Sequence, residues 1–448
     1  MEKKNQFSSK IGFILAAAGS AVGLGNIWRF PYLTAKYGGA FLITYIVLVL
    51  TFGFTLMLTE IAIGRKTGKS PFHAFKQIHP KAGIIGIIAS LVSFLILPYY
   101  SVIGGWVMKY LVGYVSGAGA TLADPAFFGS YIGQTWQPVL WQAAFVLVTL
   151  GVILLGVQKG VEKASRILMP ALVVLSLIIA VYSLTLPGAF EGVKYMLIPD
   201  FSGYSLNLVL AAMGQMFYSM SLAMGIMITY GSYMRKEDNL TQSIHHIEIF
   251  DTGVSILAGL MIIPAVFAIS GSDASINAGP GLMFQTLPQV FGSMKIGSIV
   301  GLVFFLLVLF AALTSSISLM ETTTATIAEH FKLSRTKSAL LTATLSILLG
   351  VPSSLGFSAW SNFNILGLSV LDFFDTITNS IMMPIVALAT CILIGWVVGI
   401  KPIEDEVALS GELREKKMVQ IMLRWIAPVL LVAILISGLL NTFGIITL

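Results

Sequence analysis

Long apolar stretches recur along the whole chain and are separated by short polar segments. A helix needs about 20 apolar residues to cross a hydrocarbon core about 30 Å thick, and the pattern predicts eleven such helices. Their expected ranges are 11–37, 39–64, 82–115, 138–157, 165–186, 206–234, 243–270, 295–328, 337–351, 370–399 and 418–440. The longer connections fall at 116–137, 187–205, 271–294, 352–369 and 400–417. Membrane β-strands would instead show apolar and polar residues alternating within short segments, so the sequence predicts an all-α polytopic membrane protein.

Composition supports this class. The chain has 448 residues, of which 56% are hydrophobic and only 10% charged. Soluble globular chains carry about 25% charged residues, so this chain lacks the charged surface that a water-soluble globule needs. The single cysteine, Cys391, lies in an apolar stretch and excludes a disulfide framework. No nucleotide-binding GxxxxGK[ST] or metalloprotease HExxH pattern occurs, so we expect no enzyme and no ATP-driven pump.

Basic residues are divided unevenly between the two sides of the predicted membrane protein. With the N-terminus in the cytoplasm, 21 of the 26 Lys and Arg residues fall on the cytoplasmic side. The remaining five are Arg29, Lys36, Lys109, Lys194 and Lys295. The positive-inside rule favours this orientation, and an odd number of spans then puts the C-terminus outside. The net charge of +6 therefore reflects topology in the cytoplasmic membrane, and we expect no nucleic-acid partner.

Two of the predicted helices contain Gly- and Ser-rich interruptions at mid-depth. These are residues 19–26 (GSAVGLGN) in the first helix and 219–225 (SMSLAMG) in the sixth. Paired interrupted helices in corresponding halves are typical of transporters with inverted repeats. The alternative is close helix packing of the GxxxG type through Gly19 and Gly23.

The transporter interpretation divides the chain into two five-helix repeats. The expected boundaries are a cytoplasmic N-terminus at 1–10, a first repeat at 11–186, an extracellular loop at 187–205, a second repeat at 206–399, and a cytoplasmic loop with helix eleven at 400–448.

Several charged residues fall at membrane depth, where an unpaired charge is costly and marks a functional candidate. Arg29 follows the first interruption, and Asp372 or Asp375 in the tenth helix is its available partner. Glu60 has a structural interpretation, in which its carboxylate accepts backbone N–H groups freed by an interrupted neighbouring helix.

Hydroxyl groups cluster near the interruptions. Ser219 and Ser221 lie in the sixth helix, and residues 314–318 (TSSIS) lie in the eighth. Such hydroxyls usually bond the carbonyl four residues earlier. Beside interrupted helices, however, they join free carbonyls as ligands for a hard cation.

Three motifs resemble signatures of the neurotransmitter:sodium symporter family. Residues 19–31 (GSAVGLGNIWRFP) closely resemble its first-helix signature, and residues 214–225 and 311–318 resemble those of the sixth and eighth helices. The resemblance extends over essentially the whole chain. It implies a LeuT-type fold, with helices 1 and 6 unwound at mid-membrane, and sodium-coupled uptake of an amino acid.

The resemblance also implies two sodium sites. The first would use the substrate carboxylate with the Ala21 carbonyl, Asn26, Ser219 and Asp251. The second would use the carbonyls of Gly19, Val22 and Ala311 and the hydroxyls of Thr314 and Ser315.

The resemblance further implies a substrate site and two gates. The substrate would lie among Ser20, Ala21, Leu24, Gly25, Ile96, Tyr100, Tyr218, Ser219, Ser221, Met224, Ser315 and Leu319. Within this set, Tyr100 would bond the substrate carboxylate and Tyr218 would cover the pocket. Arg29 and Asp375 would close the outer side, while Lys4 and Glu329 fall where the family's inner gate has an Arg and an Asp.

Gly23 bears on the substrate class. Monoamine-transporting relatives carry an Asp at the corresponding position, and its absence here means that the substrate should supply a carboxylate to the first sodium site. Because Ile96, Met224 and Leu319 are apolar, we expect a bulky hydrophobic or aromatic amino acid, with tyrosine among the candidates.

Asp251 bears on chloride. Animal relatives that bind chloride place an Asn there, and a fixed carboxylate can supply the negative charge instead. We therefore expect transport without chloride. Proton counter-transport through Asp251 stays open, as does a purely structural Asp251.

Two other function classes remain in view. A passive channel would need a continuous polar pore, and an amino-acid sensor with this core would usually carry a sizeable soluble domain. The sequence does not predict an oligomeric state.

Overall fold

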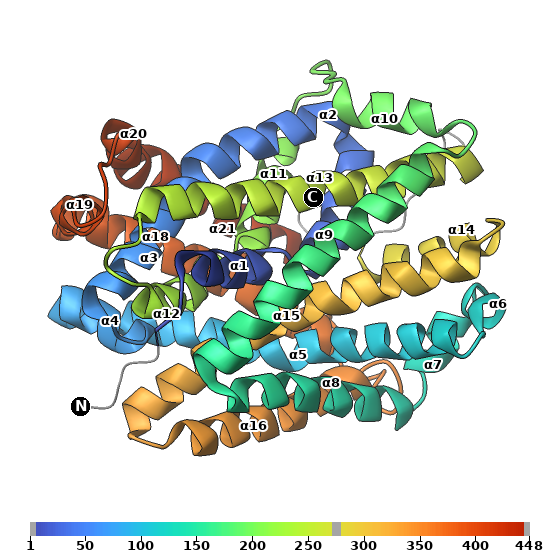
Figure 1. The fold of residues 1–448 in the computed structure, drawn as a ribbon, viewed down its shortest axis with the longest axis horizontal. Coiled ribbons are helices and arrows are strands. Elements are labelled where there is room, and N and C mark those ends of the chain that lie inside the picture. The colour runs from blue at the N-terminus through green and yellow to red at the C-terminus, as the bar shows by residue number, and fades with distance from the viewer. Residues whose placement is uncertain (1–5, 271–278, 443–448) are drawn as a thin grey trace.

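The computed structural model describes residues 6–270 and 279–442 (Figure 1). Regular structure in these ranges is helical, apart from one isolated bridge between Ile365 and Leu368. The α-helices are α1 Lys10–Ala21, α2 Phe30–Leu48, α3 Phe54–Thr67, α4 Pro71–Ile78, α5 Gly83–Val115, α6 Gly119–Leu122, α7 Phe127–Ile132, α8 Gln137–Leu154, α9 Lys163–Leu184, α10 Ala189–Leu197, α11 Leu206–Ser219, α12 Ile226–Tyr233, α13 Leu240–Ser270, α14 Leu287–Gly292, α15 Gly297–Phe331, α16 Arg335–Leu355, α17 Val370–Asp375, α18 Met383–Ile392, α19 Lys401–Ala408, α20 Lys416–Ile421 and α21 Ala427–Thr442.

Short helical segments of other types extend or join these helices. The π-helical segments are η1 Gly25–Arg29, η2 Val49–Gly53, η4 Val157–Glu162, η5 Leu282–Thr286, η6 Thr376–Met382, η7 Leu393–Val397 and η8 Met422–Ile426, and η3 Pro80–Ala82 is a 3-10 helix.

Helices long and apolar enough to span a bilayer make up most of the structure. Nine meet this description within the described residues. They cover every predicted span except the first and the sixth, whose helices are interrupted. The all-α membrane class is therefore confirmed, whereas the number of eleven spans stays a prediction.

The first two predicted spans meet at a corner at Gly38. Its φ is +64°, inside what is otherwise one helical stretch from Phe30 to Leu48. A residue without a Cβ adopts this left-handed conformation at little cost. The predicted boundary between 37 and 39 therefore coincides with the observed change of direction.

The interruption predicted in the first helix is present. After α1, Val22 is extended (φ −75°, ψ 99°), and helical structure resumes at Gly25. Backbone groups released at such a break need protein partners, because the bilayer core offers no water. The Gly23 N–H group donates to the Asn26 side-chain Oδ1 at 2.9 Å. The helix is therefore interrupted at mid-depth, and this donor still has a hydrogen-bond partner.

The interruption predicted in the sixth helix separates α11 from α12. Ser221, Ala223 and Gly225 have φ values of 53°, 61° and 76°, so three left-handed residues turn the chain. The Ala223 N–H group donates to Glu60 Oε1 of α3 at 2.7 Å. This bond confirms the structural interpretation of Glu60.

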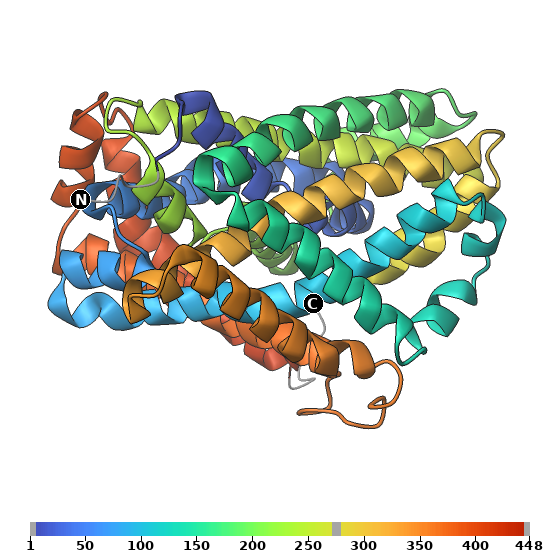
Figure 2. The ribbon, with the colours of Figure 1, turned by 60° about the horizontal axis from the view of Figure 1, so that its bottom comes forward.

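The two breaks lie beside each other inside the bundle. The Ser221 hydroxyl donates to the Ser20 carbonyl at 2.9 Å. Around them, α1 packs against α9, α13 and α15, while α5 packs against α15. Figure 2 shows the same lengthwise bundle from a second direction, with the segment between α16 and α17 projecting from its side.

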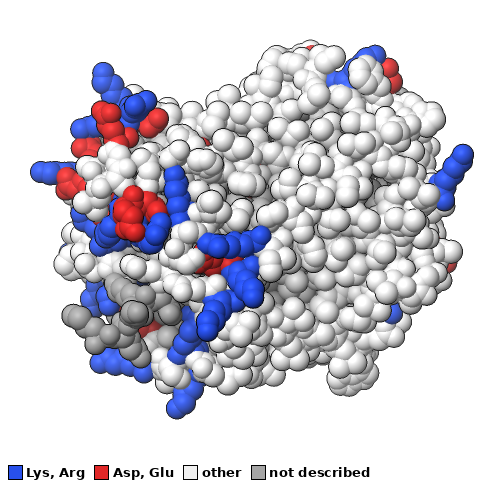
Figure 3. Space-filling view, in the orientation of Figure 1, with Lys and Arg blue, Asp and Glu red and all other residues white. Residues whose placement is uncertain are grey.

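Charged side chains gather at one end of the bundle. Figure 3 shows most of the visible Lys and Arg at the end where Figure 1 places α4, α19 and α20. The opposite end carries α6, α7 and α14 (Figure 1). The long surface between the two ends is almost free of charge in this view.

Candidate functional site

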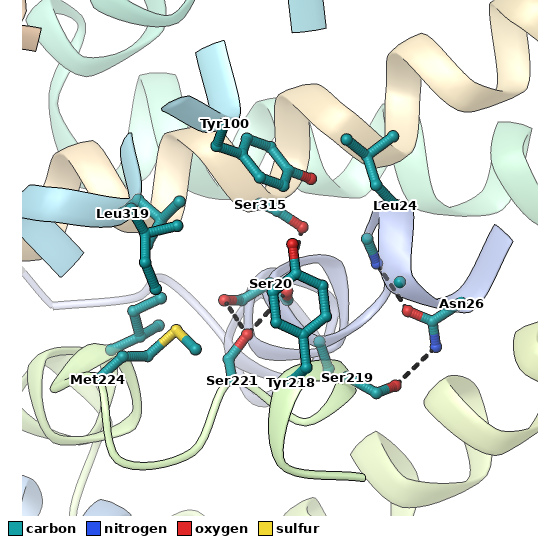
Figure 4. A pocket seen from close by; sticks show the side chains of 15 residues that line it. Ser20, Leu24, Asn26, Tyr100, Tyr218, Ser219, Ser221, Met224, Ser315 and Leu319 are labelled. Atoms are coloured by element: carbon teal, nitrogen blue, oxygen red, sulfur yellow. Dashed lines mark hydrogen bonds between the residues drawn. The ribbon is translucent and has the colours of Figure 1, made fainter. Parts of the chain in front are cut away.

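A small cavity lies where the two interrupted helices meet α5 and α15 (Figure 4). Its volume is ≈30 Å³, far below the roughly 300–1,000 Å³ of a pocket that holds a drug-sized ligand. It is lined by Ser20, Ala21, Gly23, Leu24, Gly25, Asn26, Ile96, Tyr100, Tyr218, Ser219, Ser221, Met224, Ile226, Ser315 and Leu319. Every residue expected to surround the substrate is therefore in one place.

The two ends of the cavity differ in chemistry. Asn26 and Ser219 lie at one end, and Met224 and Leu319 lie at the other (Figure 4). The middle is marked by hydroxyls, with the Ser20 Oγ donating to Ser221 Oγ at 3.0 Å. An elongated molecule with one polar and one apolar end would match this arrangement.

The Tyr100 hydroxyl is buried without a hydrogen-bond partner among the described residues. It lies on the cavity wall (Figure 4) and interacts with the Ser315 side chain and the Leu24 backbone without reaching hydrogen-bonding geometry with either. Buried donors are normally satisfied, because an unpaired one costs about 1–3 kcal/mol. This hydroxyl is therefore available to a molecule in the cavity.

Two glycines let the first interrupted helix approach its neighbours closely. A Cβ atom on Gly23 would lie 2.7 Å from Ser315 Oγ and 3.4 Å from the Tyr100 hydroxyl. A Cβ atom on Gly25 would lie 2.5 Å from the Tyr218 ring. Tyr218 thus rests directly on the helix that starts at Gly25, beside the polar end of the cavity.

Asp251 of α13 is fully buried in a compact polar cluster next to the cavity. Its Oδ1 accepts hydrogen bonds from Ser219 Oγ at 2.6 Å and Asn26 Nδ2 at 2.8 Å, and its Oδ2 accepts one from the Tyr45 hydroxyl at 2.8 Å. The Asn26 amide nitrogen also donates to Ser219 Oγ and Ser255 Oγ, both at 2.8 Å. Three oxygen atoms therefore surround one amide N–H₂ group, whose hydrogens carry partial positive charge.

The five residues expected at the second sodium site also lie together, between α1 and α15. The Ser315 hydroxyl donates to the Val22 carbonyl at 3.4 Å, and the Thr314 hydroxyl donates to the Ala311 carbonyl at 3.0 Å. A Cβ atom on Gly19 would lie 3.2 Å from Thr314 Cβ. Carbonyl and hydroxyl oxygens of this kind suit a hard cation.

Arg29 and Asp375 lie near Tyr218, and both are half-buried. They interact electrostatically, yet no ion pair joins them in the described part of the chain. Asp375 Oδ1 instead accepts a hydrogen bond from Asn379 Nδ2 at 2.6 Å. The expected outer pair is therefore close but not in contact.

At the basic end, Glu329 of α15 is held by the loop between α3 and α4. Its Oε1 lies 3.0 Å from Lys69 Nζ, and its Oε2 accepts the Ser70 N–H at 2.7 Å. Lys4, the partner expected from the sequence, lies outside the described residues. The partner that the structure gives to Glu329 is one that sequence reasoning did not identify.

Tyr45 is another residue at the site that sequence reasoning missed, as is Ile226 of the cavity lining. Tyr45 lies in α2, far along the chain from Asp251, and its hydroxyl reaches that carboxylate. The available signal was a tyrosine within an apolar span, since a buried phenol needs a partner. Groups of three or more His, Cys, Asp or Glu side chains that could hold a metal do not occur in the described ranges.

The sequence pattern of the sodium:neurotransmitter symporter family matches residues 4–118 and 132–445. The chain therefore belongs to this family, whose members are sodium-coupled transporters and not enzymes.

Individual relatives agree with this assignment. An uncharacterized sodium-dependent transporter of Bacillus subtilis, YhdH, is 37% identical over 399 residues, covering 88% of each chain. An uncharacterized sodium-dependent transporter of Haemophilus influenzae is 32% identical over 462 residues, covering 98% of this chain and 99% of its own. The crystal structure of MhsT in complex with L-phenylalanine is 38% identical, with a TM-score of 0.87 over 97% of this chain and 100% of that chain. The LeuT-type fold predicted from the sequence is thereby confirmed.

Proposed function

We propose that this protein takes up an α-amino acid together with sodium ions, by alternating access between the two sides of the membrane. The observation that carries the proposal is the buried, unpartnered Tyr100 hydroxyl, which lies on the cavity wall beside the interrupted first helix. A substrate carboxylate would satisfy this donor and would lie near the start of the helix at Gly25, where negative charge is favoured. The phenylalanine bound to MhsT supports an amino acid as the ligand class.

The substrate is proposed to be a bulky hydrophobic or aromatic amino acid, with tyrosine among the candidates. Gly23 supplies no carboxylate, and Ser315 leaves little room for a side chain there, so the acid must come from the substrate. Met224 and Leu319 form the apolar end of the cavity (Figure 4). Because a cavity of ≈30 Å³ is too small for such a ligand, Tyr218 and its neighbours must move to admit it.

Two sodium ions are proposed to bind at the two oxygen clusters. At the first cluster, rotation of the Asn26 amide would replace its N–H₂ group with its Oδ1. The oxygens that now accept hydrogen bonds from the N–H₂ group would then form a cation site with this Oδ1 and the nearby Ala21 carbonyl. At the second, the Gly19 carbonyl lacks its usual helical donor, because the Gly23 N–H group donates to Asn26 instead. The Gly19 carbonyl would therefore bind the second sodium ion together with the Thr314 and Ser315 hydroxyls.

Chloride is proposed to be unnecessary. The Asp251 carboxylate already places a fixed negative charge beside the first cluster. Two sodium ions and a zwitterion would otherwise leave an uncompensated charge in a low-dielectric setting.

The charged residues on either side of the cavity are proposed to act as gates. Arg29 and Asp375 would draw together when the outer side closes. Glu329 would release its partners when the basic end opens. The basic partner of Glu329 at this inner gate is proposed to be Lys4 or Lys69.

The protein is proposed to lie in the cytoplasmic membrane with eleven spans, its N-terminus inside and its C-terminus outside. The concentration of basic side chains at one end (Figure 3) supports this orientation. The division into five-helix repeats at 11–186 and 206–399 is part of the same proposal.

Sodium-dependent substrate binding to the purified protein tests the proposal. Labelled aromatic amino acids are expected to bind in sodium but not when potassium replaces it. Thr314→Val removes one hydroxyl ligand while keeping the side-chain shape, and should weaken sodium affinity by about 5–150-fold, equivalent to about 1–3 kcal/mol.

The matched control is Thr323→Val, at a position further along α15. The Thr323 hydroxyl donates to the Leu319 carbonyl of the same helix at 3.0 Å. It should leave the sodium affinity close to native. Binding that is equal in potassium, or a native sodium affinity in Thr314→Val, would contradict the proposal.

A further inference from the structure

Several lysines at the basic end of the bundle have no acidic partner among the described residues, and three of them lie on neighbouring helical segments. Lys159 lies in η4, Lys163 starts α9, and Lys337 lies in the first turn of α16. All three are exposed, and within residues 6–270 and 279–442 no ion pair or side-chain hydrogen bond holds any of their ammonium groups.

Two neighbouring arginines are paired. Arg166 Nη2 lies 2.7 Å from Glu162 Oε1, and Arg335 Nη2 lies 2.5 Å from Glu321 Oε2. The local acids are thus already engaged. The three lysines, with Lys332 at the end of α15, therefore carry positive charge that the described acids of this part of the surface do not compensate.

The fold brings the three lysines to one side of the bundle. Arg335 Nη2 donates to the Ile153 carbonyl at 3.1 Å, which holds the start of α16 against the end of α8. The segment η4 packs against both α8 and α9. Lys159 and Lys163 are four residues apart, so their side chains are neighbours on one helical face.

Beside these lysines, the same helices carry exposed apolar side chains. Ile167, Val174 and Ile178 of α9 have exposed fractions of 60%, 54% and 54%, and Leu155 after α8 and Leu348 of α16 are also exposed. Figure 3 shows that a largely uncharged surface adjoins the basic end of the bundle in this view. A hydrocarbon-facing surface thus leads directly to a cluster of free ammonium groups.

We propose that Lys159, Lys163 and Lys337 bind the phosphate of an anionic phospholipid whose acyl chains lie along α8, α9 and α16. The long lysine side chains place their charge at headgroup depth while their stems follow the apolar surface. A soluble anion would use the lysines but not the apolar faces beneath them, so the arrangement fits a lipid better.

The proposed lipid would lie next to a contact that fixes the start of α1. Glu162, between Lys159 and Lys163, accepts hydrogen bonds from the Ser8 N–H at 2.7 Å and the Ser8 hydroxyl at 2.6 Å. A headgroup held by the flanking lysines should stabilise this contact. We therefore expect the bound lipid to raise the melting temperature of the whole protein.

The test uses the full-length protein, with bound lipid counted by native mass spectrometry and stability measured by thermal unfolding. The probes are dioleoylphosphatidylglycerol, dioleoylphosphatidylcholine and soluble glycerol phosphate. The native protein should retain phosphatidylglycerol preferentially and melt at a higher temperature with it, by an amount that falls as salt is raised.

The variant Lys159→Gln/Lys163→Gln/Lys337→Gln should bind phosphatidylglycerol more weakly, by about fivefold for each lysine removed. The matched control removes three exposed lysines from η3, α19 and α20, as Lys81→Gln/Lys401→Gln/Lys417→Gln, and should keep native retention. Three results would overturn the proposal: native retention in the first variant, an equal loss in the control, or equal stabilisation by glycerol phosphate.

Discussion

At the scale of single residues, the site depends on polar groups whose partners come from distant parts of the chain. Asp251 was recognisable from the sequence as an acid inside an apolar span. Tyr45, which donates to it at 2.8 Å, was not, because nothing local to Tyr45 indicates that α2 and α13 meet there. Lys69 was missed for the same reason, since only the fold shows that the loop after α3 reaches Glu329.

The first prediction concerns chloride. Uptake by the native protein should be unchanged when gluconate replaces chloride, because Asp251 supplies the negative charge. Asp251→Asn removes that charge while keeping a similar shape, so its uptake should fall steeply in gluconate and be stimulated by chloride.

The same experiment separates two roles of Asp251. If the carboxylate is only structural, bonded to Ser219 and its neighbours, the Asn variant should lose stability without gaining a response to chloride. Native uptake that collapses in gluconate would contradict chloride independence.

At the scale of elements, the interruptions themselves were predictable and their detailed shape was not. The Gly-rich stretch at 19–26 marks the first break, and Gly38 marks the corner that follows. In the second break, Ser221 and Ala223 adopt left-handed conformations that local preference alone would not assign to them. Tertiary contacts select this shape, including the bond between Ser221 and Ser20.

The second prediction concerns the support of that break. Glu60→Ala would leave the Ala223 N–H group buried and unpaired, which should lower the free energy of unfolding by about 1–3 kcal/mol. Glu60→Gln keeps an oxygen acceptor and should retain most of the stability. Thermal unfolding in a fixed detergent compares the two variants, and equal stability of the native and Ala proteins would contradict this role of Glu60.

At the scale of the whole molecule, hydropathy was enough to predict an all-α membrane bundle, since nine long apolar helices are present in the described ranges. Hydropathy did not reveal which helices surround the cavity. That arrangement depends on packing between α1, α5, α11 and α15, and only the family resemblance anticipated it.

The third prediction concerns orientation. Cysteine-reactive, membrane-impermeant label applied to intact cells should modify a cysteine placed after Leu448 but not one placed before Met1, in a background where the buried Cys391 is replaced by Ala. Labelling at the N-terminal position only would show that the orientation is reversed, and labelling at both ends would show that the number of spans is even.

The proposed function depends on sodium driving the movement of an amino acid. The most direct measurement is uptake of a labelled aromatic amino acid into proteoliposomes with an inward sodium gradient. We expect accumulation above the external concentration, and we expect it to disappear when a sodium ionophore collapses the gradient. Entry that only equalises the two concentrations would indicate a passive channel. Sodium-dependent binding without any entry would indicate a sensor, and either result would contradict coupled transport.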